Sequence, residues 1–177
     1  FILNGKKQVL NVNPSDRISK VLREDLGLMG TKVGCNAGDC GSCTILVNKE
    51  PICSCLMTAA KAQNTDIQTI EGLSAKGAND LQKSFLKHGA AQCGICTPGL
   101  LITATALLRK NPKPSKNEVE NALNALSTTI GNDGCVKVTR TALTEVTYRW
   151  SVTFQSNEGN LEMMRPNGAN LVGTGVS

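Results

Sequence analysis

The sequence predicts a two-part α+β protein, in which a small mixed α/β domain precedes a small helical domain and an extended tail. Strand and hairpin signals dominate the chain up to Gly72, and helix signals dominate it afterwards. Each part also carries its own group of cysteines. We place the two domains at residues 1–73 and 79–150, joined by a linker of small residues, and the tail at residues 151–177.

The first part is expected to open with a β-hairpin, because Asn4-Gly5 between two strand-like stretches is the strongest short hairpin signal. Helix-start chemistry at residues 14–16 and a C-cap glycine at Gly27 then delimit one helix. Its apolar residues recur at helical spacing: Ile18, Val21, Leu22 and Leu26. An irregular glycine-rich loop over residues 30–43 and short strands at 44–47 and 66–70 complete this part.

The second part is expected to contain four helices. The first includes Leu81, Phe85 and Leu86, and the second begins at Thr97-Pro98, a cap residue followed by proline. Ser115 and Glu118 form a capping box for the third helix. Residues 141–148 are assigned to a fourth helix, and the Gly-, Asn- and Ser-rich stretch after Ser151 to the tail.

Composition excludes several classes of protein. The net charge of +5 comes from scattered basic residues, and aromatic residues make up 3% of the chain, so a basic stripe interleaved with aromatics, as in nucleic-acid binding, is absent from the sequence. No apolar run reaches the roughly 20 residues of a membrane span, and no signal-peptide pattern opens the sequence. We therefore predict a cytoplasmic protein, or a periplasmic one if a leader has been removed.

Four of the eight cysteines match a cluster-binding pattern. Cys35, Cys40 and Cys43 are spaced C-x4-C-x2-C, and Cys55 follows twelve residues later, as in plant-type [2Fe–2S] sites. Glycines between the ligands let backbone N–H groups approach an anionic cluster. A disulfide framework would leave an odd cysteine in this half, so we favour iron–sulfur over disulfide or zinc.

Cys53 is the fifth cysteine of this group. It lies two residues before Cys55 and shares its face if the segment is a strand. It could substitute as a ligand, but we favour the role of a small buried apolar residue beside the site.

The second cysteine group is less specific. Cys93 and Cys96 form a C-x-x-C pair just before the helix start at Thr97, where N–H groups favour thiolate. The pair fits a thioredoxin-like redox motif, half of a zinc site or half of a cluster site. Cys135 is the only further cysteine in this half, so three ligands are present where four are expected.

Two motifs carry a family resemblance: Gly34-Cys-Asn-Ala-Gly-Asp-Cys-Gly-Ser-Cys-Thr44 and Gln92-Cys-Gly-Ile-Cys-Thr-Pro-Gly99. They resemble the two-cluster module of the molybdenum hydroxylase, or xanthine oxidase, family over roughly residues 1–150. The resemblance implies a β-grasp, plant-type ferredoxin-like domain followed by a four-helix bundle. It implies that Gln92 contacts the molybdopterin cofactor of a partner. The implied ligands are Cys35, Cys40, Cys43 and Cys55 for one cluster, and Cys93, Cys96 and a later C-x-C for the other.

The sequence departs from the family at that later pair. The family's Cys-Arg-Cys appears as Cys135-Val136-Lys137, so a lysine occupies the place of the last thiolate. Lysine is a hard, normally protonated amine and a poor iron ligand beside thiolates. A misassigned residue, a shifted register or a degenerate site would each explain it, and we favour the first.

The resemblance implies electron transfer within an oxidoreductase of the aldehyde oxidoreductase or xanthine dehydrogenase type. A molybdenum-binding domain or large subunit would oxidise aldehydes or hydroxylate aromatic heterocycles, and an FAD-containing subunit or another acceptor would take the electrons. No nucleophile or acid–base pair stands out in this chain, and His88 is assigned to a helix end or the surface. A free-standing carrier with one cluster and a zinc-stapled interaction module are the alternatives.

Overall fold

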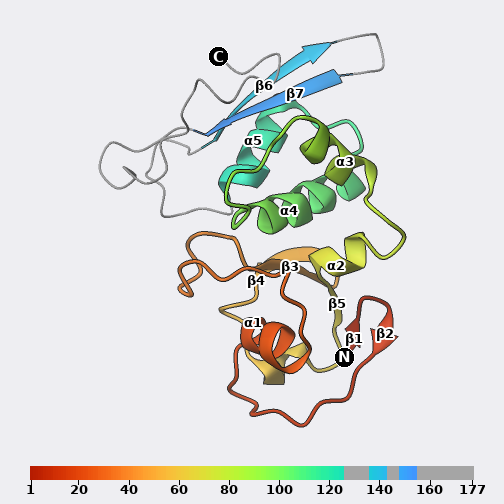
Figure 1. Ribbon diagram of the computed structural model, residues 1–177, viewed down its shortest axis with the longest axis vertical. Coiled ribbons are helices and arrows are strands. Elements are labelled where there is room, and N and C mark those ends of the chain that lie inside the picture. The colour runs from red at the N-terminus through yellow and green to blue at the C-terminus, as the bar shows by residue number, and fades with distance from the viewer. Residues whose placement is uncertain (126–135, 143–147, 155–177) are drawn as a thin grey trace.

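The computed structural model describes residues 1–125, 136–142 and 148–154, which form two parts (Figure 1). A sheet with helix α1 occupies one end, helices α3 to α5 form the middle, and a β-hairpin covers the other end. In these described ranges, no helix is both long and apolar enough to span a membrane.

The first part is built on a mixed five-stranded sheet of order β2-β1-β5-β3-β4. Strand β1 pairs in parallel with β5, and the other neighbouring pairs are antiparallel. The predicted N-terminal hairpin is confirmed, because Asn4 and Gly5 join β1 and β2 with φ of 51° and 79°. The strands are β1 (Ile2–Leu3), β2 (Lys6–Lys7), β3 (Thr44–Val47), β4 (Glu50–Cys53) and β5 (Asp66–Gln68).

Strand β4 was not predicted, and it contains Pro51, a residue that is rare within strands. The edge position of β4 accommodates this residue, since a proline needs no ladder partner for its missing N–H there. Its hairpin with β3 turns at Asn48 and Lys49, both with positive φ. Strand β5 is shorter than predicted, because Ile70 already begins helix α2 (Ile70–Leu73).

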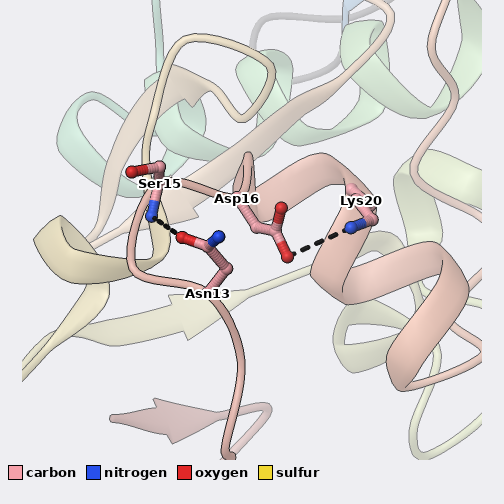
Figure 2. Close-up of polar contacts among 4 residues, drawn as sticks. All are labelled: Asn13, Ser15, Asp16 and Lys20. Carbon is pink, nitrogen blue, oxygen red and sulfur yellow. Dashed lines mark hydrogen bonds and ion pairs between the residues drawn. The ribbon is translucent and has the colours of Figure 1, made fainter.

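The predicted helix after the hairpin is confirmed, and its start is stabilised by local polar contacts. Figure 2 shows Asn13 Oδ1 accepting the Ser15 N–H at 2.9 Å and Lys20 paired with Asp16 at 3.1 Å. Helix α1 (Ile18–Lys20) continues as a π-helical turn, η1 (Val21–Asp25). The helix and the sheet share one core with the segment around the 3-10 helix η2 (Ala59–Ala62), made of Leu3, Ile18, Leu22, Ile45, Val47, Met57, Ala62 and Ile67.

Three of the predicted helices of the second part are present. They are α3 (Asp80–Lys87), α4 (Thr97–Lys110) and α5 (Lys116–Asn124). The capping box of Ser115 and Glu118 is formed as predicted, and Asn79 and Gln82 form another at α3. Leu100 of α4 and Leu123 of α5 pack together in the small core of this part.

The predicted fourth helix over residues 141–148 is wrong. Strand β6 (Val136–Ala142) pairs antiparallel with β7 (Tyr148–Phe154), so both ends of the predicted helix lie in strands. Valine and threonine recur along both strands, and β-branched residues favour this conformation. Strand β7 also includes residues 151–154, which we assigned to the tail, whereas residues 155–177 lie outside the described ranges.

Helix α4 lies against strands β3 and β4 and joins the two parts. Ile102 and Ala106 of α4 are buried against Leu46 of β3, with Leu73 of α2 packed beside them. At the C-terminal end of α4, Arg109 donates to Gln68 at 2.8 Å and Lys110 pairs with Glu50 at 2.7 Å. The helix is therefore held to the sheet along its length.

Candidate iron–sulfur site

The cysteines of the first group range from fully buried to exposed. Cys43 and Cys55 are 2% and 1% exposed, Cys40 is half-buried and Cys35 is exposed. The loop between η1 and β3 supplies three of these residues, and Cys55 follows β4, which pairs with β3. The β3–β4 hairpin thus brings the sequence-distant Cys55 to the loop.

Three backbone N–H groups point at the sulfur atom of Cys35. The N–H groups of Ala37, Asp39 and Cys40 each lie 3.3 Å from Cys35 Sγ. These donors, led by Ala37, lower the pKa of the Cys35 thiol to about 7, because they stabilise the thiolate. The loop reaches this shape through Asn36 and Gly38, which have φ of 56° and 86°.

The thiols of this group influence one another's pKa values. The Cys53 thiol lowers the pKa of Cys43 to about 5, because a neighbouring S–H group favours the Cys43 thiolate. The interaction with Cys43 and, second, burial raise the pKa of Cys53. Burial, followed by the interaction with Cys43, raises the pKa of Cys55 to about 11. Bound iron would supply the positive charge that a full set of thiolates needs.

The chemistry of this donor set fits a cluster. A [2Fe–2S] cluster would divide four thiolates between its two irons. The N–H donors provide the sulfur hydrogen bonds that such an anionic group requires.

The second cysteine group is more open. Cys93 and Cys96 are both exposed, and Cys96 is the N-cap of α4. Cys96 is exposed as a whole residue, but its sulfur is partly shielded from water, and this desolvation, followed by the negative charge of Cys93, raises the pKa of Cys96. Cys135 lies outside the described residues, and Lys137 is the second residue of β6, where it pairs with Thr153.

Two other residues singled out in the sequence lie near the second group. Gln92 is exposed immediately before Cys93. His88 is the C-cap of α3, is exposed, and its Nδ1 lies 2.9 Å from the Ser84 carbonyl oxygen, which confirms the predicted helix-end position.

Two family models match successive parts of the chain. A 2Fe-2S iron-sulfur cluster binding domain model matches residues 1–71, and a [2Fe-2S] binding domain model matches residues 69–130. The nicotinate dehydrogenase small FeS subunit of Eubacterium barkeri is 44% identical over 69% of this chain and 78% of its own length. The nicotine 6-hydroxylase small subunit of Paenarthrobacter nicotinovorans is 43% identical, over 69% of this chain and 74% of its own.

A solved structure agrees with these relatives. Quinoline 2-oxidoreductase from Pseudomonas putida 86 matches with a TM-score of 0.68 and 44% identity, over 75% of this chain and 83% of the matched chain. The chain belongs to the iron–sulfur small subunits of the molybdenum hydroxylase family. It is accordingly a part of an oxidoreductase complex.

Two residues of this molybdenum hydroxylase subunit were not singled out from the sequence. Ser42 is 2% exposed, and its Oγ lies 3.1 Å from both the Gly34 nitrogen and Cys40 Sγ. The Arg17 guanidinium donates to the carbonyl oxygen of Asn36 in the cysteine loop. The position of Ser42 between Cys40 and Cys43 could have identified it from the sequence. Arg17 is distant in sequence from the cysteine loop, so only the folded structure reveals its contact with Asn36.

Proposed function

We propose that this chain transfers electrons through two [2Fe–2S] clusters, from a molybdenum site on a partner subunit to a separate acceptor. The observation that carries the proposal is the cage of N–H donors around Cys35 in a loop with plant-type ligand spacing. When bound, each cluster takes up and releases one electron at a time. The chain's own residues hold the sulfurs, donate hydrogen bonds to them and limit their contact with water.

The proposed ligands of the first cluster are Cys35, Cys40, Cys43 and Cys55. Burial of Cys43 and Cys55 supports this set, because it would shield one side of the cluster from water. The exposed Cys35 would leave the other side near the protein surface, where an electron can pass to a partner. We assign the surrounding residues 1–73 to a β-grasp, ferredoxin-like domain, on the basis of the mixed sheet packed against α1.

The proposed ligands of the second cluster are Cys93, Cys96 and Cys135, within a helical domain over residues 79–150. The match of residues 69–130 to a [2Fe-2S] binding domain supports this assignment. The N-terminus of α4 next to Cys96 supports it as well, since helix N–H groups stabilise nearby negative charge.

The proposed partner is a molybdenum-binding large subunit whose pterin cofactor contacts Gln92. Support comes from the exposure of Gln92 next to Cys93, which leaves its amide free to bind another chain. The substrate class we assign to the complex is aldehydes or aromatic heterocycles, and relatives named for nicotinate and nicotine favour heterocycles. We place the chain in the cytoplasm, where thiols stay reduced, with a flavin subunit or another acceptor taking the electrons.

An iron determination combined with electron paramagnetic resonance (EPR) spectroscopy of the dithionite-reduced holoprotein tests this function. We expect about four iron atoms per chain and two distinct rhombic signals, because two clusters carry two irons each. A folded, colourless protein without iron would refute the proposal.

One observation favours a second candidate, a ferredoxin-like carrier with a single cluster. Lys137 occupies the position of the expected last thiolate. This candidate predicts about two iron atoms per chain and one signal in the same experiment.

A further inference from the structure

A glycine contact joins the two cysteine groups across the boundary between the two parts. Gly99 is buried in the first turn of α4, three residues after Cys96. Gly41 precedes Cys43 by two residues in the other loop. A Cβ atom built on Gly99 would lie 2.2 Å from the Gly41 carbonyl oxygen and 3.3 Å from Ser42 Cα. The two backbones therefore touch directly, with no space for a side chain between them.

Glycine at this place has no local explanation. It lowers helix stability relative to alanine, and at position 99, inside α4, no positive φ requires it. The close approach of the two backbones is the feature that needs it.

The Gly41 side of the contact is also held firmly. Its carbonyl oxygen accepts hydrogen bonds from the Thr44 N–H at 3.1 Å and from the Thr44 hydroxyl at 2.6 Å. Gly41 has a φ of 66°, a conformation that suits glycine. The loop thus presents its carbonyl to α4 in one fixed orientation.

The rest of this interface lies farther along α4. Ile102 and Ala106 pack in its middle, and Arg109 and Lys110 bind Gln68 and Glu50 at its far end. The glycine contact is therefore the part of the interface nearest to Cys43 and Cys96 in sequence.

We infer that the Gly41–Gly99 contact is the electronic connection between the two clusters, with Gly99 as the residue that sets their separation. This inference rests on the proposed function. The connection runs from Cys43 through Ser42 to the Gly41 carbonyl, and from Gly99 through Pro98 and Thr97 to Cys96. A methyl group at position 99 would force the two backbones apart and weaken electronic coupling, while all cysteines remain.

The test is EPR spectroscopy of the fully reduced holoprotein at low temperature, in the wild type and in Gly99→Ala. We expect two cluster signals with spin–spin splitting in the wild type. In Gly99→Ala, we expect both signals and the iron content to remain and the splitting to decrease. Stopped-flow reduction should show slower equilibration between the clusters in the same variant.

Arg109→Ala is the matched control, because it removes a contact of the same helix far from the cysteines. It should keep the wild-type splitting. Thr44→Val provides a second variant if Gly99→Ala assembles poorly, since it removes the hydroxyl that orients the Gly41 carbonyl and nearly preserves volume. We expect a smaller decrease in splitting from it.

The outcomes separate this inference from the function on which it rests. Wild-type splitting in a Gly99→Ala protein that retains both signals would overturn the role of the contact alone. If that variant fails to assemble, wild-type splitting in Thr44→Val would overturn it. A wild-type protein with only one cluster signal would overturn the proposed function, and the role of the contact with it.

Discussion

The two cysteine groups differ in how completely this chain prepares them. Around the first, N–H groups surround Cys35, and Cys43 and Cys55 are almost fully buried. At the second, Cys93 and Cys96 are exposed, and Lys137 stands where a thiolate is expected. The first site is therefore prepared by its loop and the β3–β4 hairpin, whereas under the proposed function the second needs Cys135, from a segment farther along the chain, and a partner that covers its exposed cysteines.

Removing a ligand from the first site should have the largest effect on this comparison. We expect Cys43→Ala to abolish the first cluster and leave the second. The position of Cys43 is buried, so water cannot readily replace its thiolate as an iron ligand. Iron content and EPR signals provide the measurement. Cys53→Ala is the matched control and should retain the first cluster; loss of iron from it would show that Cys53 is a ligand.

Supplying the missing thiolate should make the second site resemble the first. We expect Lys137→Cys to keep about four iron atoms per chain and to slow the loss of iron from the second cluster to a chelator, because a soft thiolate replaces a protonated amine. Thr139→Cys, two residues along the same strand, should not slow it. An unchanged rate of iron loss in Lys137→Cys would argue that the fourth ligand comes from elsewhere.

Removing the Ser42 hydroxyl should tune the first cluster without removing it. The Ser42 oxygen accepts the Gly34 N–H, so its own proton is free to be donated to the Cys40 thiolate. We expect Ser42→Ala to lower the first cluster's reduction potential by about 60 mV, the one-electron equivalent of roughly 1.4 kcal/mol. An EPR-monitored redox titration measures this, and the second cluster's potential serves as the internal control.

The cluster-free protein should show a smaller difference, in thiol reactivity. The pKa of Cys35 is lowered to about 7 and that of Cys96 is raised above its ordinary 9.0, so Cys35 is mostly thiolate at a lower pH. We expect Cys35 to react with iodoacetamide half-maximally near pH 7, and Cys96 only at higher pH. Mass spectrometry of the labelled peptides measures the labelling of both cysteines in one experiment. Equal pH profiles would contradict the lowering of the Cys35 pKa by the surrounding N–H donors.

Predictions from the sequence succeeded where a local pattern determines the outcome. The Asn4-Gly5 hairpin and the Ser115 capping box depend only on residues within a few positions of each other, and both are formed. The prediction of a fourth helix was wrong, because the pairing between β6 and β7 determines the conformation there and the local helix pattern, rich in threonine, is weak. Strand β4 was missed, and only its edge position makes Pro51 acceptable.

The sequence by itself determined the type of cofactor and the family, because ligand spacing and ligand chemistry are written directly in the order of the cysteines. The tertiary structure decided which groups surround the sulfurs and how the two halves meet. The Ser42 hydroxyl, the Arg17 contact and the approach of Gly99 to Gly41 depend on how distant segments pack, and no spacing along the chain specifies such contacts.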